Sequence, residues 1–354
     1  MKHKQRSKKF SARATRCLTA GLTALLFAFA VSSSAGAQEK EGPPPAPVLD
    51  TGMTPVGPPP APLLEWGARP ADIPDGYMII EGDIQVPIGF FELDMPWASN
   101  TWPGGVVPYE FDANVTTANR TAMRLAMGEW SAVAQVTFNE FGCDFFYCVH
   151  IQNSNVNNSA VGRQLFRQTI NIFNWNFRFI MAHELAHALG FWHEQSRTDR
   201  NTYVTINYGN IIPGEEHNFD IANGSGRYGP YDYDSVMHYG RRDFSRNGMD
   251  TITVLQNPGY WQDRIGQRDH LSQFDALIMG FIYSRANWRF VDASYGGFFQ
   301  FGTFFEPFRQ FLPGYNATPT GGTLWVQPGD YSGNAGTYSR AMTWRAPLGG
   351  VTVR

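Results

Sequence analysis

Three histidines and one glutamate fall within eleven residues, in the stretch 183–193, and could together hold and use a metal ion. On an α-helix His183 and His187 lie on one face, roughly 6 Å apart along the axis, so both imidazoles can reach one ion. Glu184 flanks that face, where a carboxylate can deprotonate a metal-held water. Imidazole nitrogens beside such a base are typical of catalytic zinc sites, so this stretch predicts one.

His193 must come from outside that helix, and Gly190 explains how. His193 lies ten residues after His183, roughly 15 Å along an unbroken helix, whereas zinc needs its nitrogens at about 2.0 to 2.1 Å. Glycine adopts the left-handed conformation that ends helices, so Gly190 can turn the chain back toward the metal. The alternative is a surface helix that happens to carry histidines. A glycine and a third histidine at these offsets count against it.

Four further stretches, together with 183–194, resemble the astacin family of metzincin zinc proteases. They are Trp102 to Tyr109, Arg197 to Asn207, Tyr231 to Tyr239 and Ile265 to Asp275. The resemblance covers about residues 93–284 and implies an α+β fold of the zincin/metzincin type. It also implies one catalytic Zn²⁺ ion, and protein or peptide substrates whose internal bonds are hydrolysed without a covalent acyl-enzyme.

The same resemblance implies roles for individual side chains. Met237 forms the apolar floor beneath the zinc, while Tyr239 ligates zinc at rest and then donates its hydroxyl to the oxyanion of the reaction. Glu194 pairs with the N-terminus that is freed in the mature enzyme. Glu184 takes a proton from the zinc-bound water and passes it to the departing amine. The simpler alternatives are a core methionine, a buried tyrosine with a satisfied hydroxyl and an exposed carboxylate.

Residues 1–37 are typical of a secretory signal peptide. They hold seven basic and no acidic residues, a 14-residue apolar run from Leu18 to Val31, and the small residues 35–37. A membrane span needs roughly 18 to 20 apolar residues, which disfavours the alternative of a retained anchor. Without this segment the chain carries 21 Lys+Arg against 31 Asp+Glu. This predicts a secreted, acidic protein, extracellular or periplasmic, with no nucleic-acid partner and no stable membrane insertion.

Residues 38–92 are predicted to be a proline-rich spacer followed by a pro-segment. The stretch 79–84 resembles the astacin motif whose aspartate, here Asp83, occupies the open zinc position in the zymogen. Ile80 stands where the family prefers phenylalanine. An ordinary turn at Gly82 and Asp83 is the alternative.

Activation must follow an unusual route, because no lysine or arginine lies between Arg69 and Arg120. Astacins are commonly activated at a basic residue, so a trypsin-like enzyme cannot free the N-terminus at the right place. Many astacins favour an acidic residue just after the bond that they cut. We therefore expect self-cleavage before Glu92 or Asp94.

Cys143 and Cys148 are the cysteines that remain once the signal segment is removed. Their spacing suits a small local disulfide in an oxidising compartment. His150 nearby leaves open a second metal site. The two longer-range disulfides usual in astacins lack their partner positions here.

Periodicity places elements around the zinc stretch. It predicts a strand at 106–111, a helix at 117–134, a strand from 149 and an edge strand at 168–172. An edge strand beside the cleft would let an extended substrate add to the sheet through main-chain hydrogen bonds.

Residues 285–354 form a different compositional region, rich in glycine and aromatic residues. They are predicted to be a small β-rich C-terminal module and weakly resemble the opening coil of right-handed parallel β-helix proteins. The module is a cap on the protease, an appendage that binds glycan or another protein, or a remnant. The alternative function is therefore a surface or matrix binding protein with the protease unit as scaffold. A binding scaffold has no need of Glu184, which favours a zinc-dependent endopeptidase made as a zymogen.

Overall fold

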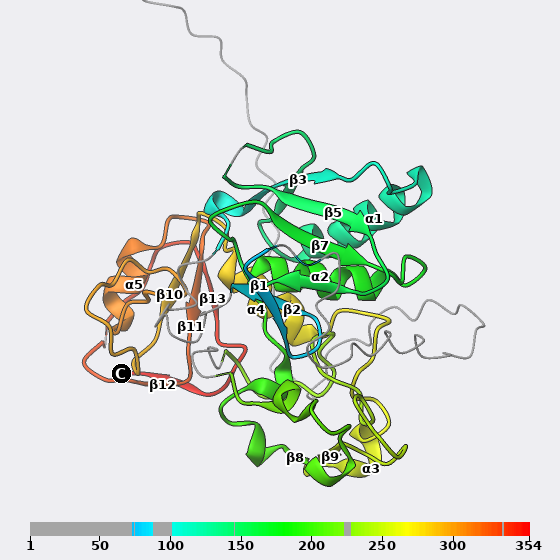
Figure 1. Cartoon of the computed structure of the whole chain (residues 1–354). Coiled ribbons are helices and arrows are strands. Elements are labelled where there is room, and N and C mark those ends of the chain that lie inside the picture. The colour runs from blue at the N-terminus through cyan, green and yellow to red at the C-terminus, as the bar shows by residue number, and fades with distance from the viewer. Residues whose placement is uncertain (1–72, 74, 88–100, 145, 223–227, 335) are drawn as a thin grey trace, which may run out of the picture. The chain divides into compact units, whose positions relative to one another are not determined.

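The computed structural model describes residues 73, 75–87, 101–144, 146–222, 228–334 and 336–354, all of which fall in one compact unit (Figure 1). The predicted signal peptide, the spacer and the bonds before Glu92 and Asp94 lie outside these residues. Within the described ranges, no helix combines the length and apolar character that crossing a bilayer requires.

A mixed sheet forms the upper part of the described chain, with strand order β1-β2-β6-β7-β5-β3-β4. The strands are β1 (Tyr77–Ile80), β2 (Ile84–Pro87), β3 (Val106–Phe111), β4 (Thr137–Asn139), β5 (Val149–Asn153), β6 (Asn158–Ala160) and β7 (Gln168–Ile172). Strands β4, β3, β5 and β7 run parallel, β6 runs antiparallel to β7, and β2 runs parallel to β6. Helices α1 (Thr117–Val133) and α2 (Arg178–Leu189) lie beneath the sheet (Figure 1).

Local signals fix several of these elements. The predicted strand at 106–111 is β3, and the predicted helix at 117–134 is α1, one residue shorter. The Thr116 side chain caps α1 by accepting a hydrogen bond from the Asn119 backbone N–H. Inward-facing residues of α1 and β5, such as Trp130 and Ile151, share one apolar core with α2.

The prediction of an edge strand at 168–172 is wrong. β7 lies between β5 and β6, and all five of its residues are buried. Its polar positions, which resemble solvent-facing ones, make hydrogen bonds inside the protein: the Asn171 amide donates to Asn158 at 2.8 Å, and the Gln168 amide donates to the Gly162 carbonyl at 2.9 Å. β6 is instead the strand that pairs with β2 of the predicted pro-segment.

The lower part of the described chain connects the sheet to α4 (Gln273–Ile282). It contains the antiparallel pair β8 (Val204–Ile206) and β9 (Ile252–Val254), the short helix α3 (Pro258–Trp261), and the 3-10 helices η4 (Glu194–Ser196), η5 (Arg200–Thr202), η6 (Tyr208–Asn210) and η7 (Glu216–Phe219). A further 3-10 helix, η3 (Pro103–Gly105), directly precedes β3. Ser272 and Asp275 form a capping box at the start of α4. The Asp275 carboxylate also accepts hydrogen bonds from Ser235 Oγ and the Val236 N–H, which fixes the loop before Met237.

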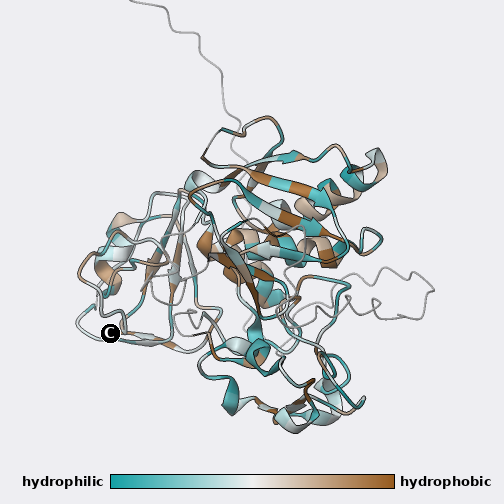
Figure 2. Ribbon diagram, viewed as in Figure 1, coloured by the Kyte–Doolittle hydropathy of each residue, from teal (hydrophilic) through white to brown (hydrophobic). Residues whose placement is uncertain are grey.

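The C-terminal region is β-rich, as predicted. β10 (Trp288–Val291), β11 (Thr323–Val326) and β13 (Thr343–Arg345) form one parallel sheet, and β12 (Gly329–Tyr331) pairs in parallel with β14 (Val351–Val353); α5 (Phe311–Ala317) precedes β11. Apolar residues run along α4 and the strands of the large sheet (Figure 2). The β-helix resemblance and the domain boundaries 1–37, 38–92, 93–284 and 285–354 stay predictions.

Candidate metal centre

Helix α2 carries His183 and His187 on one buried face and ends at Gly190, as the sequence predicts. Gly190 has φ 112, and its N–H donates to the His187 carbonyl at 2.8 Å. A left-handed residue here reverses the chain, since only glycine adopts this φ without steric cost. The reversal brings His193 back to the two helical histidines.

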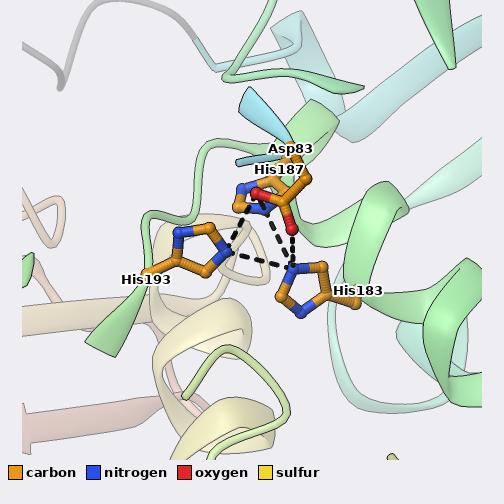
Figure 3. A group of neighbouring side chains, drawn as sticks. All are labelled: Asp83, His183, His187 and His193. Carbon is orange, nitrogen blue, oxygen red and sulfur yellow. Dashed lines mark hydrogen bonds and ion pairs between the residues drawn. The ribbon is translucent and has the colours of Figure 1, made fainter. Parts of the chain in front are cut away.

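The three imidazoles meet through their Nε2 atoms (Figure 3). His183 Nε2 lies 3.1 Å from His187 Nε2 and 3.2 Å from His193 Nε2. Tetrahedral zinc with nitrogens at its usual distance separates neighbouring donors by about 3.3 Å. The spacing therefore fits one zinc ion.

Hydrogen bonds on the opposite ring nitrogens orient the imidazoles. Nδ1 of His183 donates to the Val236 carbonyl, and Nδ1 of His187 donates to the Phe191 carbonyl, each at 2.8 Å. Nδ1 of His193 donates to Glu81 Oε2, also at 2.8 Å. With the proton on Nδ1, each Nε2 lone pair faces the centre.

Asp83 supplies a fourth donor from the turn between β1 and β2 (Figure 3). Its Oδ2 lies 3.2 Å from His183 Nε2, and its Oδ1 lies 3.2 Å from His193 Nε2 and 3.7 Å from His187 Nε2. Within the described residues this buried Oδ1 has no hydrogen-bond partner. Three imidazoles and an orphaned carboxylate oxygen are a donor set that zinc would satisfy.

The buried ionisable groups at this centre shift one another's pKa values. Burial alone would lower the pKa of His193, but Asp83 and Glu81 outweigh it and raise the pKa to about 9. Burial lowers the pKa of His183 to about 4. Burial alone would raise the pKa of Asp83, but the positive charge of a protonated His193 and the contact with His183 outweigh it and hold the pKa well below its usual range.

Glu184 and Tyr239 lie in the same buried environment. Glu184 Oε2 has no hydrogen-bond partner within the described ranges, and burial, followed by the charge of Asp83, raises the pKa of Glu184. The Tyr239 ring lies 4.6 Å from the His193 ring, and its hydroxyl donates to the Glu81 carbonyl. Burial raises the Tyr239 pKa well above its usual value, which keeps the hydroxyl a donor. His238 packs beside them, with its Nδ1 donating to the Tyr239 carbonyl.

Met237 and Glu194 lie next to a cavity. Met237 is buried, and its carbonyl accepts a hydrogen bond from the Glu194 N–H at 3.1 Å. Glu194 Oε1 accepts from the Asp232 N–H at 2.8 Å and from Arg197 Nη1 at 3.1 Å. Burial raises the Glu194 pKa to about 8, although Arg197 opposes the shift. The cavity measures about 100 Å³ and is bordered by both residues and by Phe305.

Comparison with known proteins decides the family. Residues 95–284, more than half of the chain, match the model of the family Astacin (Peptidase family M12A). The chain belongs to the astacin family. The matched residues therefore form a domain of a family of zinc-dependent peptidases.

Two curated relatives illustrate the extent of the match. Human tolloid-like protein 2 is 41% identical over 180 residues, which cover 49% of this chain and 18% of that protein. High choriolytic enzyme 2 of Oryzias latipes is 32% identical over 219 residues, which cover 58% of this chain and 76% of that protein. This astacin thus spans less than a fifth of tolloid-like protein 2.

A solved structure is also similar. High choriolytic enzyme 1, a hatching enzyme zinc-protease from Oryzias latipes, is 32% identical; the alignment covers 54% of this chain and 98% of that chain, with a TM-score of 0.49.

Two residues at the centre of this astacin were not singled out by the sequence. Glu81 lies in the stretch 79–84, where the sequence signal was a second carboxylate two residues before Asp83. Arg268 lies in the stretch from Ile265 to Asp275, which resembles the family but indicates no role for this arginine. Its Nη1 donates to the His238 carbonyl at 3.0 Å, and its positive charge acts on both Glu184 and Asp83.

The predicted disulfide between Cys143 and Cys148 is present in this astacin. His150 instead contacts two carboxylates: its Nδ1 lies 3.1 Å from Glu110 Oε1, and its Nε2 lies 3.2 Å from Asp112 Oδ2. Cysteines joined to each other offer no thiolate to a metal. This arrangement disfavours the alternative of a second metal site.

Proposed function

We propose that this astacin is made as a latent precursor, exported, and cleaves internal peptide bonds with Glu184 as its general base. One observation carries the proposal: the Asp83 carboxylate lies against all three imidazole Nε2 atoms. A donor in that place occupies the position that a catalytic zinc site keeps open for water or substrate.

His183, His187 and His193 would hold the zinc ion. When bound, zinc supplies a Lewis acid that polarises the scissile carbonyl and acidifies a nearby water. Glu184 then accepts the proton, because its buried Oε2 has no hydrogen-bond partner among the described residues and burial raises its pKa, which makes it a stronger base than an exposed carboxylate. Glu184 returns the proton to the departing amine.

Tyr239 would stabilise the oxyanion once its hydroxyl is released from Glu81. A hydroxyl that stays protonated and is already aimed at this centre can donate to developing negative charge at little reorganisation cost. Met237 packs below as an apolar floor.

Latency would then have three parts, all supplied by the β1–β2 hairpin (77–87). Asp83 fills the fourth position, the Glu81 carbonyl holds Tyr239, and β2 pairs with β6. An extended substrate would use the strand edge that β2 covers. Removal of the hairpin frees all three at once.

The freed N-terminus would pair with Glu194. Glu194 lies beside the cavity, and burial raises its pKa to about 8 although Arg197 is paired with it. An α-amino group in the cavity would lower that pKa and complete the pair. We keep cleavage before Glu92 or Asp94 by the enzyme itself as the activation route.

Export rests on the N-terminal signal-like segment and on the Cys143–Cys148 disulfide, which belongs to oxidising compartments. No finding supports the alternative of a binding protein that uses the protease unit as scaffold. Binding of glycan or another protein by residues 285–354 stays a prediction.

The test compares purified wild-type precursor with Glu184→Gln, which keeps the ligands and removes the base. Glu216→Gln, an exposed site distant in sequence from the centre, is the matched control. We expect both variants to bind zinc in equal amount by elemental analysis. Wild type and the control should mature and cleave a peptide library, while Glu184→Gln should do neither.

Two outcomes would contradict the proposal. Near-normal turnover by zinc-loaded Glu184→Gln would remove Glu184 as the base. Maturation of isolated Glu184→Gln precursor at the same bond would remove self-cleavage as the activation route.

A further inference from the structure

The three histidines differ in where their outer hydrogen bonds come from. His183 and His187 donate to the Val236 and Phe191 carbonyls, which belong to the catalytic region itself. His193 donates to Glu81 Oε2, which lies 112 residues away in the hairpin. The proposed activation removes that hairpin, so one of the three imidazoles would lose its acceptor.

Glu81 is held firmly in this place. Only 4% of Glu81 and 1% of His193 is exposed, and the bond between them is 2.8 Å long. Glu81 has φ 47, a left-handed conformation that costs a non-glycine residue energy. The conformation persists because its carbonyl accepts from Tyr239 and because Ile80 and Ile84 on either side pack in one apolar cluster.

The turn itself demands this geometry. Gly82 follows Glu81 with φ 74, and a Cβ at Gly82 would lie 2.5 Å from a ring carbon of Phe244. Two successive left-handed residues point the Glu81 and Asp83 side chains to the same centre. Glu81 contacts Nδ1 of His193, the ring nitrogen that points away from the metal centre, while Asp83 contacts Nε2, which points toward it.

A carboxylate on the outer nitrogen of a metal-binding imidazole fixes the ring and makes it a stronger ligand. Loss of such a partner typically lowers metal affinity by about 10- to 100-fold. The carbonyls that serve His183 and His187 are neutral acceptors, so Glu81 provides the one charged outer partner among the three within the described residues.

We propose that Glu81 is a positioning residue for His193, so that the precursor binds zinc more tightly than the mature enzyme. The hairpin would complete the metal centre while it blocks the reaction, and the precursor would be the form that is loaded with zinc. This inference rests on the proposed function, in which the histidines hold zinc and the hairpin is removed.

The test uses full-length precursor in a Glu184→Gln background, which prevents self-cleavage. Glu81→Ala removes the acceptor, and Glu81→Gln retains a neutral one. Gln85→Ala is the matched control, because Gln85 is a buried polar residue of the same hairpin that bonds to Asn158 and Thr169 and not to a histidine. Zinc affinity is measured by competition with a chelator, and Co²⁺-loaded protein reports ligand geometry through its visible absorption spectrum.

We expect Glu81→Ala to weaken zinc binding by about 10- to 100-fold and to shift the Co²⁺ spectrum. Glu81→Gln should fall between Glu81→Ala and the parent, while Gln85→Ala should keep the parent affinity and spectrum. Equal affinities for Glu81→Ala and the parent would overturn the inference. An equal loss in Gln85→Ala would also overturn it, because the effect would then come from hairpin docking.

Zinc binding by His187→Ala distinguishes a failure of this inference from a failure of the proposed function on which it rests. If His187→Ala loses zinc while Glu81→Ala retains it, only the role of Glu81 fails. If His187→Ala retains zinc, the metal centre itself is misassigned and the proposed function fails.

Discussion

The hairpin 77–87 and the C-terminal region 288–353 both attach to the catalytic region, but by different physical means. The hairpin attaches through charged and polar contacts at the metal centre and through a small apolar cluster formed by Ile80, Ile84, Val86 and Val161 with Trp192. The C-terminal region attaches through aromatic side chains. The apolar cluster that joins it to α4 contains none of the three histidines among the described residues.

Phe281 of α4 is the centre of the aromatic contact. Its ring centroid lies 5.3 Å from that of Phe290 and 4.8 Å from that of Trp325, and all three side chains are buried. Phe191, just after the helix that carries His183 and His187, packs against the same cluster. The C-terminal region therefore shares a core with the catalytic region.

The difference explains which segment can leave. At the metal centre the hairpin bonds to groups that a metal, water and substrate can satisfy after it departs, and its apolar contact is confined to one small cluster. Each buried aromatic side chain covers about 150 to 250 Å², and burial stabilises by about 25 cal/mol per Å². Water cannot replace contacts of that kind.

Truncation after Ser284 tests the comparison most severely. An accessory module could be removed without harm to small-peptide cleavage, which is what the composition of residues 285–354 suggests. The shared core predicts instead that the truncated protein is insoluble or unfolded. Soluble yield and circular dichroism measure this, with Phe298→Ser as control because Phe298 is 88% exposed. A folded, active truncation would mean that the aromatic contact is dispensable.

Phe281→Ala should lower the free energy of unfolding by about 3 to 5 kcal/mol, the usual cost of deleting a buried aromatic side chain. The catalytic and C-terminal regions should still unfold in one transition, because Phe281 belongs to both. Calorimetry and urea titration followed by tryptophan fluorescence check this. Two separated transitions would show that the regions are independent.

Ile84→Ala should act on the hairpin alone. Ile84 is fully buried in the cluster with Val161, so the substitution should weaken hairpin docking by about 2 to 4 kcal/mol. The main unfolding transition should stay in place, while residues 77–87 become accessible to an added protease and latency is partly lost. If the midpoint of the main unfolding transition falls as far as in Phe281→Ala, the hairpin stabilises the fold as much as the C-terminal region does.

Tyr239→Phe links the hairpin to catalysis. In mature enzyme the loss of one oxyanion donor should lower kcat by on the order of 10² with little loss of zinc. In the precursor the same change removes the hydrogen bond to Glu81 and should loosen the hairpin by about 1 kcal/mol. Steady-state kinetics and protease accessibility measure the two effects. An unchanged kcat would show that Tyr239 packs in the core and takes no part in catalysis.

Asp232→Asn should change stability only as pH changes, and it tests the start of α4, where Ser272 donates to Asp232. Burial, with Asp275 adding to it, raises the Asp232 pKa to about 7. A carboxyl whose folded pKa is raised stabilises the protein below its unfolded pKa of about 3.9 and loses that contribution as pH rises through about 7. The amide introduced by Asp232→Asn cannot ionise, so the variant should lose less stability than wild type between about pH 4 and pH 8, by roughly 1 to 3 kcal/mol. Urea titrations across this pH range measure the difference, and parallel stability curves would contradict the assignment.

Patterns of neighbouring residues correctly predicted the strand and the helix that such patterns specify. β3 and α1 follow from alternation, from helical periodicity and from the cap at Thr116. The edge position predicted for 168–172 is wrong because the sheet continues beyond β7 through β6 and β2. The Gln168 and Asn171 amides are satisfied inside the sheet by groups that no local pattern reveals.

The sequence by itself determined the metal-binding stretch of this astacin, because a four-residue helical spacing and one left-handed glycine bring His183, His187 and His193 together through local geometry. The resemblance of residues 79–84 predicted Asp83 at the open position, whereas only the tertiary structure showed that Glu81 contacts His193. Asp83 and Glu81 approach from about a hundred residues away, and the C-terminal aromatic residues complete the core around Phe281. Contacts between distant residues depend on the folding of everything between them, so no spacing along the chain encodes them.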